Sequence, residues 1–453
     1  MSPPTNATEF AATEAVLQQA LADYKAALEV DKVPPPHLND FKPAVLDDPN
    51  FVPSPALGQA TMTLISSLGR MTHMVQTSVE RYRLLSLEHW INRSVVLVDK
   101  QKIPQLLINA GDKGMSVEEL GPKVNVHPER LLATLRLLAN EDIFVEVKEG
   151  VFAHNRTSMA LAQVELCSAT VGHLAFHSYL AAVEMPRKWA DSAKQGKIEP
   201  DVTLWSEQFG YTGKMTYWQY LESAGLTQRF ATMMGCIPTG SLAQAFDFSG
   251  LLGNGTTIVD IGGGRGTTLM AILDRYPTLK GIVLDMAPVR QAFDDYWRDS
   301  TVVKEGRITF EVGNYFDEQP EKRRNEQGYH YLVRCILHDL PDDKAVTVLR
   351  RIAAAMHSSS KLIVIDEIMQ PALPQPVGTK PLPLETPPGP LPASGGMAKT
   401  FRNLLDLEMH ASFNAKERTK KDFEALYAQA GLKLVKTAHF TASYPLQVVE
   451  LAL

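Results

Sequence analysis

Cysteine is scarce in this chain of 453 residues, where it occurs at Cys167, Cys236 and Cys335. The three cysteines are scattered and lack the paired spacing of a structural metal site. A chain without a disulfide framework suits a reducing compartment. We therefore expect no bound metal and a cytoplasmic location.

An excess of basic charge and long apolar runs are also missing. The 45 Lys and Arg residues are outnumbered by 51 Asp and Glu residues, which gives a net charge of −6 and no field that attracts nucleic acid or an anionic membrane. No apolar run approaches the ~20 residues of a membrane-spanning helix. The opening MSPPTNATEF has no signal-peptide pattern. We expect neither nucleic acid nor a membrane as a partner.

Length and pattern indicate several domains. Residues 1–56 combine a helix with a proline-punctuated arm, and residues 57–165 have the pattern of a winged helix. Residues 166–245 are mostly helical, whereas residues 246–453 alternate between strands and helices. We predict a Rossmann-like α/β domain preceded by a mainly helical domain.

Residues 94–160 show helices followed by a hairpin. Ser116 suits a helix N-cap, Pro128 suits the first position of a helix, and Glu149-Gly150 suits a hairpin turn. A winged helix can bind DNA or join two copies of a protein. Because the chain is acidic and has no basic recognition helix, we expect dimerisation.

The helical region 166–245 is rich in aromatic residues and methionine. Most such residues pack a core, but a cluster beside a cofactor domain can also line an apolar substrate pocket. The residues concerned are Phe176, Trp189, Trp205, Phe209, Tyr217, Trp218, Tyr220, Phe230, Met233 and Met234.

Strand-like and helix-like stretches alternate from residue 256 onward. This alternation is typical of a parallel, doubly wound sheet with helices on both faces. The chain ends in two strand-like runs, 432–440 and 446–453, whose short connection predicts an antiparallel hairpin at the sheet edge. The other expected strands are 257–261, 281–284, 308–312, 330–336 and 361–366, and the expected helices are 267–275, 287–297 and 342–357.

Residues 370–396 interrupt this alternation. They contain nine prolines, so neither a regular helix nor a regular sheet can form there. We expect a disordered surface insertion, with a lid or a partner-docking segment as the alternative.

A glycine-rich turn follows the first of these strands, in the stretch TIVDIGGGRGTTLM. Gly262, Gly264 and Gly266 give the spacing G-x-G-x-G, and the third glycine of a dinucleotide fingerprint is absent. Such a turn lets backbone N–H groups approach a ligand closely. Asp285 ends the next strand and can accept both hydroxyls of a ribose. The pattern indicates a nucleoside without phosphates, such as S-adenosyl-L-methionine.

Six motifs carry a resemblance to a known family. They are VDIGGGRG (259–266), IVLDMAPV (282–289), VGNYFD (312–317), LVRCILHDLPDD (332–343), KLIVIDE (361–367) and DLEMHASFNAKERTKKDFEALYAQAGL (406–432). In this order they resemble the plant- and fungal-type class I S-adenosylmethionine-dependent O-methyltransferases, over roughly residues 60–453. The resemblance implies a class I methyltransferase domain with an antiparallel last strand, a winged-helix dimerisation domain, a homodimer and a small-molecule substrate.

Methyl transfer to oxygen needs a base that removes the hydroxyl proton. His338 follows the expected strand 330–336, at the same edge of the sheet as the glycine turn, and the resemblance makes it the catalytic base. A carboxylate must orient the imidazole, and the family pattern offers Asp366 and Glu417. Because side chains alternate along a strand, only one of Asp366 and Glu367 can face the site.

The resemblance also implies the remaining site residues. The implied cofactor-binding residues are Asp260, Gly262, Gly264, Asp285 on the ribose, Asn314 and Tyr315 near the adenine, and Arg334. The implied substrate-binding residues are Thr232, Met234, Met409 and Phe413. The methionines and the phenylalanine indicate a flat, apolar acceptor. Plant relatives have an acid at the position of Asn314, and relatives have glycines where this chain has Asn414 and Ala415.

Two functions remain open at this point. The first is O-methylation of a small secondary metabolite with His338 as general base. The second is a non-methylating cyclase on the same fold, which performs dehydration and pericyclic ring formation while the sulfonium acts as a fixed charge. The set of His338, Asp339 and Glu417 favours the first function, because a pericyclase does not need these residues as a set.

Overall fold

The computed structural model describes residues 6–48, 51–191, 198, 202–234, 242–243, 246–318, 323, 326–440 and 444–452. It divides into two compact units. Unit 1 consists of Met1–Ala60 and Ser67–Cys236, and unit 2 of Thr61–Ser66 and Ile237–Leu453. The winged-helix and linker regions of the sequence therefore belong mostly to unit 1, and the α/β region to unit 2. Cys236 itself lies outside the described residues.

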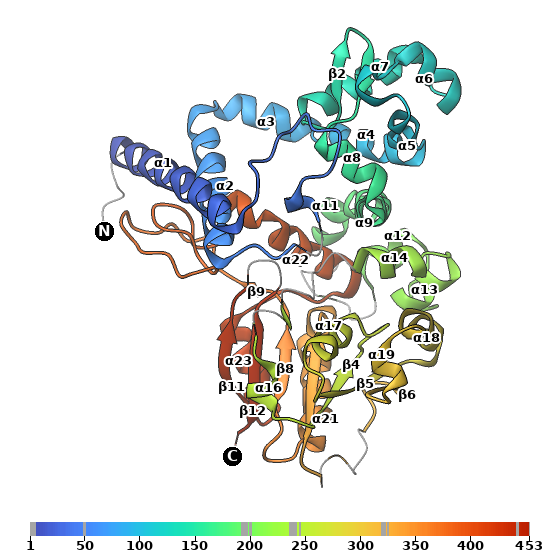
Figure 1. Ribbon diagram of the computed structural model, residues 1–453, viewed down its shortest axis with the longest axis vertical. Coiled ribbons are helices and arrows are strands. Elements are labelled where there is room, and N and C mark those ends of the chain that lie inside the picture. Colours follow the sequence, from blue (N-terminus) through green and yellow to red (C-terminus); the bar gives the residue numbers. More distant parts are fainter. Residues whose placement is uncertain are drawn as a thin grey trace. The chain divides into compact units, whose positions relative to one another are not determined.

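Unit 2 is built on a seven-stranded sheet (Figure 1). Its strands are β4 (Thr257–Ile261), β5 (Lys280–Asp285), β6 (Ile308–Val312), β7 (Tyr329–Arg334), β8 (Leu362–Ile365), β11 (Leu432–Ala438) and β12 (Leu446–Leu451). The strand order is β11–β12–β8–β7–β4–β5–β6. β4 to β8 run parallel, and β12 lies antiparallel to both β8 and β11. This topology confirms the predicted doubly wound sheet with an antiparallel hairpin at one edge.

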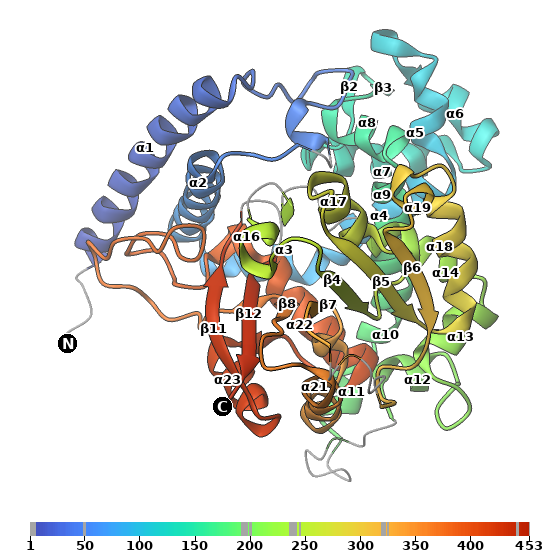
Figure 2. The same ribbon diagram turned by 60° about the horizontal axis from the view of Figure 1, so that its bottom comes forward.

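Helices pack on both faces of this sheet, as Figure 2 shows. They are α16 (Phe248–Leu252), α17 (Thr267–Arg275), α18 (Arg290–Trp297), α19 (Thr301–Lys304), α21 (Asp342–Ala355) and α23 (Lys420–Gln429). Unit 2 also contains α22 (Thr400–Phe413). One face buries α21 and α23 against the sheet, and the other buries α16 to α19. Every residue of β8 is buried, as expected for a parallel strand covered on both faces.

Short elements connect these layers. They are η6 (Ala287–Val289), η7 (Leu337–Asp339), η8 (Gly396–Lys399), β9 (Ile368–Met369) and β10 (Arg418–Thr419). β9 and β10 form a parallel two-stranded sheet in which Arg418 is paired with Ile368. This pairing holds the segment before α23 beside the end of β8.

The described part of unit 1 is mainly helical. Its helices are α1 (Asn6–Asp31), η1 (Val45–Asp47), α3 (Ser78–Leu87), α4 (His89–Lys100), α5 (Ile103–Ile108), η2 (Gly111–Lys113), α6 (Val117–Val124), α7 (Pro128–Asn140), α8 (Arg156–Gln163), α9 (Glu165–Thr170), the π-helix η3 (Val171–Ser178), α10 (Tyr179–Ala182), α11 (Met185–Trp189), α12 (Leu204–Gln208), α13 (Tyr217–Ser223) and α14 (Thr227–Met233). The helix α2 (Pro55–Val75) is divided between the units, since its residues Thr61–Ser66 belong to unit 2. A small sheet has the order β1 (Met115–Ser116), β3 (Val151–Ala153) and β2 (Val145–Lys148).

Local signals place most of these elements. Ser116 caps α6, since its Oγ accepts from the N–H of Glu119 at 3.2 Å, and Pro128 begins α7. The stretch from His89 to Ile108 forms two helices, because Lys102 is left-handed (φ 56°) and separates α4 from α5. The role of this region in dimerisation stays a prediction.

The aromatic residues of the second half of unit 1 pack around Trp205, which is completely buried. The rings of His173 and Phe209 lie 5.7 and 5.0 Å from it, and Tyr217 meets it edge to face at 5.1 Å. Burial lowers the pKa of His173 to about 3, so this imidazole is neutral. For these residues, core packing accounts for the cluster.

The proline-rich segment 370–396 is ordered, contrary to our expectation of disorder. Gln375 donates to the carbonyls of Pro387 and Leu391, both at 2.9 Å. An isolated antiparallel bridge joins Pro374 to Pro392. Side-chain hydrogen bonds to backbone carbonyls thus replace the ladder that proline cannot form. Regular helix and strand are absent over most of the segment, as expected.

Among the described residues, no single helix is long and apolar enough to cross a membrane. Arg156–Gln163 and Glu165–Ala182 meet the criteria of length and composition only when taken together, and the chain bends by 86° between them.

Candidate active site

Predicted site residues follow the carboxyl ends of five neighbouring parallel strands of unit 2. They are Gly262 after β4, Asp285 at the end of β5, Tyr315 after β6, His338 after β7 and Asp366 after β8. In a parallel sheet these ends share one edge, and open α/β folds bind ligands there. The topology therefore gathers the predicted cofactor-binding and catalytic residues of unit 2.

The turn after β4 needs its glycines. Gly262, Gly264 and Gly266 have φ values of 66°, 58° and 81°, in the left-handed region. A Cβ at Gly262 would lie 2.8 Å from Cδ1 of Ile336, whereas a Cβ at Gly264 would have no neighbour within 4 Å. Gly262 is thus fixed by packing, and Gly264 presents an open side to a ligand.

Asp285 supports this turn from the next strand. Its Oδ2 accepts from the N–H of Gly264 at 2.8 Å, and its Oδ1 from the N–H of Met286 at 2.7 Å. Burial raises its pKa, and these two hydrogen bonds oppose that rise. Because a carboxylate has about four lone-pair sites, both oxygens can still accept a ribose hydroxyl. Nearby, burial raises the pKa of Asp260 to about 7 against the charge of Arg334.

Three further cofactor predictions fall on the same edge. Oδ1 of Asn314 accepts from the N–H of Phe316 at 3.0 Å, so this oxygen already serves its own loop. Burial raises the pKa of Tyr315 to about 12, which keeps the phenol neutral. Arg334 donates to Oγ1 of Thr268 at 2.8 Å. The contacts of these residues with adenine or methionine stay predictions.

His338 and Glu417 form a buried pair. Nδ1 of His338 and Oε1 of Glu417 lie 2.7 Å apart, and both side chains are almost fully buried. The backbone N–H of Glu417 donates to Oδ1 of Asp406 at 2.8 Å. This hydrogen bond holds the backbone that carries the Glu417 carboxylate. On the other side of the ring, Nε2 lies 3.5 Å from Asp339. The pair has the geometry of an oriented base, with Nε2 left to meet a substrate.

The choice between Asp366 and Glu367 is resolved by their partners. Glu367 forms an ion pair with Arg402 at 2.8 Å. Asp366 is completely buried, and neither of its oxygens has a hydrogen-bond partner among the described residues. Among the neighbouring charges, that of His338 has the largest effect on the pKa of Asp366, which it lowers. Asp366 therefore lies on the side of His338, and Glu367 on the side of Arg402.

Three carboxyl groups surround one imidazole. Burial alone would lower the pKa of His338, but the charges of Asp339 and Glu417 and the hydrogen bond to Glu417 outweigh it and raise the pKa to about 10. Burial raises the pKa of Asp339 to about 6 and that of Asp366 to about 7. In the ligand-free protein His338 is therefore cationic at neutral pH.

Sequence reasoning missed Cys335. Its sulfur lies within 4.8 Å of a ring nitrogen of His338 and an oxygen of Asp366. Burial raises the pKa of this thiol well above its usual range, so the sulfur is protonated. Our expectation of no metal stays a prediction. The spacing Cys-x-x-His after a strand was the signal that could have drawn attention to this residue.

The predicted substrate residues fall in two places. Met409 is buried and Phe413 is half-buried, both on α22 of unit 2. Thr232 and Met234 lie on α14 and at its end in unit 1. Their relation to His338 stays a prediction. Asn414, where relatives have glycine, ends α22 in a left-handed conformation (φ 51°), which asparagine tolerates better than most residues.

Comparison with known proteins points to one family. Residues 187–386 match the model of the O-methyltransferase domain. O-methyltransferase tpcA of Aspergillus fumigatus is 27% identical over 424 residues, which cover 85% of this chain and 86% of that protein. The chain is thus similar to O-methyltransferases over most of its length. At the level of the family, this confirms the predicted enzyme class and the predicted cofactor, S-adenosyl-L-methionine.

Solved structures extend this likeness to most of the fold. The mitomycin 7-O-methyltransferase MmcR is 25% identical, with a TM-score of 0.65 over 83% of this chain and 98% of that chain. A protein described as a pericyclic reaction enzyme is 19% identical, with a TM-score of 0.67 over 87% of this chain and 94% of that chain. The second likeness concerns the fold alone, so the fold is compatible with both predicted chemistries.

Proposed function

We propose that this O-methyltransferase transfers the methyl group of S-adenosyl-L-methionine to a hydroxyl of a small, apolar or aromatic secondary metabolite, with His338 as general base. The observation that carries the proposal is the buried 2.7 Å contact between His338 and Glu417 at the edge of the sheet that also holds the glycine turn. A base oriented by a carboxylate beside a nucleoside site is what base-assisted methyl transfer requires.

The chain's own groups suit this cofactor. Asp285 would accept from the ribose hydroxyls, Gly262 and Gly264 would lie under the methionine part, and Asn314 and Tyr315 would lie near the adenine. When bound, the cofactor supplies an electrophilic methyl group on a sulfonium. The fit rests on the open side of Gly264 and on the lone pairs that remain on Asp285.

In the proposed mechanism, His338 removes the proton of the acceptor hydroxyl at Nε2. Glu417 holds Nδ1, fixes the orientation of the ring and stabilises the imidazolium that forms. Since the three carboxyl groups make His338 cationic in the ligand-free protein, a positive charge entering the site must lower its pKa before it can act. The proposed base is therefore active only when the site also holds a cation.

The acceptor class follows from the residues expected around it. Met409 and Phe413 contribute apolar side chains from α22, and the resemblance adds Thr232 and Met234 as substrate residues. Fungal relatives include O-methyltransferases gedA of Aspergillus terreus and cicE of Emericella nidulans. A flat, apolar hydroxylated metabolite fits these side chains.

One experiment tests the function directly. The purified protein is incubated with isotopically methyl-labelled cofactor and a panel of phenols, anthraquinones and hydroxypyridones, and products are followed by mass spectrometry. We expect a labelled methyl ether and one equivalent of S-adenosylhomocysteine per product. If the labelled cofactor is bound but never consumed with any acceptor, the proposal is wrong.

A second candidate is favoured by one observation. The raised pKa of His338 makes it a cation at neutral pH, and a buried imidazolium suits stabilisation of a developing oxyanion rather than proton removal. A cyclase that forms rings by dehydration and a pericyclic step would use His338 in this way. In the same experiment it would give a ring-closed product of unlabelled mass, with the cofactor intact.

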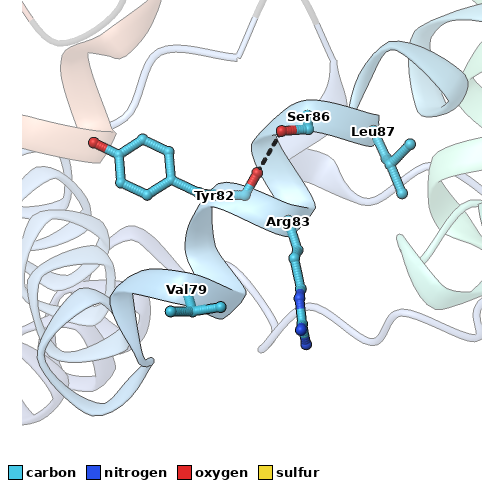
Figure 3. Close-up of a pocket in the computed structure, with 5 residues that line it drawn as sticks. All are labelled: Val79, Tyr82, Arg83, Ser86 and Leu87. Atoms are coloured by element: carbon cyan, nitrogen blue, oxygen red, sulfur yellow. Dashed lines mark hydrogen bonds between the residues drawn. The ribbon is translucent and has the colours of Figure 1, made fainter.

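We also propose that the protein is a homodimer. α3 has no buried residue among its ten, and Tyr82 and Val79 are 72% and 64% exposed. An open hollow of about 620 Å³ follows this helix and is lined by Val79, Tyr82, Arg83, Ser86 and Leu87 (Figure 3). A short helix with exposed apolar side chains needs a covering surface to be stable. A second copy of the chain meets this need, in line with the resemblance that predicted dimerisation.

A further inference from the structure

One arginine holds the backbone on both sides of His338. Nη1 of Arg418 donates to the carbonyl of Leu337, and Nη2 donates to the carbonyl of Leu340 at 2.7 Å. These carbonyls belong to the residue before His338 and to the second residue after it. The two ends of a single guanidinium group thus enclose the position of the proposed base.

The loop that carries His338, residues 335–340, has few stabilising contacts within itself. Cys335 has a left-handed backbone (φ 52°), and the turn that follows is closed by two long hydrogen bonds, from Asp339 to Ile336 at 3.2 Å and from Leu340 to Leu337 at 3.3 Å. A left-handed conformation costs a non-glycine residue about 1–2 kcal/mol. Contacts from outside the loop must therefore maintain this geometry.

The guanidinium is itself fixed in place. The side chain of Arg418 is completely buried, and its Nε and Nη2 donate to Oδ1 of Asp342 at 3.0 and 2.7 Å. Lys416 lies 3.2 Å from the other oxygen of Asp342. Asp342 is the first residue of α21, so the arginine ties the loop to a helix. Only a planar fork can reach two carbonyls and a carboxylate at once, because lysine is a point charge.

Neighbouring residues of one segment hold the imidazole and its backbone separately. Glu417 contacts the ring of His338, while Arg418 contacts the carbonyls around it. β10 begins at Arg418 and pairs with β9, which begins two residues after Asp366. A shift of this segment would therefore move the ring and its backbone together.

We propose that Arg418 is a positioning residue, which sets the place and orientation of His338 by clamping the carbonyls of Leu337 and Leu340 onto Asp342. The inference rests on the proposed function for its kinetic consequence, but its structural consequence can be measured without catalysis. Arg418 itself touches neither the cofactor nor the acceptor in this scheme.

The test uses the full-length protein with two substitutions at the clamp and one control. Arg418→Lys keeps the charge and loses the fork, and Asp342→Asn weakens the anchor while leaving the carbonyl contacts. Lys416→Met is the matched control, since Lys416 lies on the same segment and contacts the same Asp342, but the structure gives it no bond to the loop carbonyls. For each protein, kcat, the KM values, cofactor affinity by calorimetry, and a crystal structure with S-adenosylhomocysteine are obtained.

We expect Arg418→Lys to lower kcat about 10²-fold, because displacement by ~1 Å at a reacting centre has such an effect. Cofactor affinity should stay within about twofold, and the crystal structure should show the imidazole moved from its 2.7 Å contact with Glu417. Asp342→Asn should give a smaller loss in the same direction, and it decides the matter if Arg418→Lys does not fold. Lys416→Met should behave as wild type.

Two results would overturn the inference. One is a folded Arg418→Lys protein with wild-type kcat and only a lower Tm. The other is a crystal structure of that variant in which His338 and Glu417 keep their contact. If the wild-type protein transfers no methyl group at all, the proposed function fails, and the crystal structures still decide whether Arg418 positions His338.

Discussion

At the scale of the residue, the charge on His338 decides what the site can do. Three carboxyl groups, from Asp339, Asp366 and Glu417, oppose the burial that would otherwise keep the ring neutral. From β10, the charge of Arg418 lowers the pKa of Asp366 and so favours its ionised form. With this balance of charges His338 keeps its proton, and a second cation in the site would lower its pKa.

Glu417→Gln tests this balance. The carboxylate raises the pKa of His338, and the base must be neutral to act, so the wild-type rate rises with pH as the ring loses its proton. With glutamine the pKa falls, and the rising limb of the kcat–pH profile should move to lower pH. The maximal rate should also fall, since the ring loses a charged partner. Unchanged limbs in the profile would show that Glu417 does not control the ionisation of the base.

Asp285→Asn tests the cofactor site alone. The amide keeps the shape but loses the charged acceptor, and a hydrogen bond to a charged group is worth about 1.5–3 kcal/mol. Calorimetry should therefore show cofactor affinity lowered roughly 10- to 100-fold. His338→Ala serves as the comparison, with affinity nearly kept and kcat lowered ~10²–10⁴-fold. Equal affinity in Asp285→Asn and wild type would remove Asp285 from the ribose site.

At the scale of the element, the turn after β4 separates packing from ligand binding. Gly262 and Gly264 share a left-handed backbone, but only the first would place a Cβ against Ile336. The two positions therefore offer the same substitution in two different environments.

Gly262→Ala and Gly264→Ala should differ in a defined way. Both carry the strain of a left-handed alanine, about 1–2 kcal/mol, but Gly262→Ala also forces Ile336 to move. We expect Gly262→Ala to lower the Tm of the ligand-free protein more, and Gly264→Ala to lower cofactor affinity out of proportion to its Tm. The measurements are calorimetric melting and titration of both variants. The opposite ranking of the two would contradict the open side assigned to Gly264.

Secondary structure was largely predictable from the sequence, whereas the contacts within the site were not. Strand β4 begins and ends where its β-branched run and glycines indicated, because those are local signals. The choice of Asp366 over Glu367 depends on Arg402, and the grip of Arg418 spans about eighty residues of chain. The order of the proline-rich segment depends on Gln375, whose partners no local rule identifies.

At the scale of the whole molecule, the chain divides into two units with different features. Unit 2 holds the predicted base, its carboxylate and the cofactor turn, while unit 1 holds α3 with its exposed apolar face. We propose that assembly and chemistry are correspondingly separable.

Tyr82→Glu combined with Leu87→Glu should turn the proposed dimer into a monomer. Burying a charged group in an apolar interface carries a large desolvation cost, so association should weaken. The fold of the single chain should be unaffected, because Tyr82 and Leu87 are exposed in it. Light scattering after size-exclusion chromatography measures the mass of wild type and variant. Lys102→Glu, outside α3, is the control for added negative charge. A wild-type protein of monomer mass at micromolar concentration would contradict the proposed homodimer.

The self-closing segment 370–396 has one more consequence. Because Pro374 meets Pro392 and the N–H of Ala393 donates to the carbonyl of Leu373, the chain leaves and re-enters the domain at almost the same point. Such a detour can lengthen, shorten or acquire new side chains without shifting the strand before it or the helix after it. The segment is a place where this enzyme can change its surface while its chemistry stays as it is.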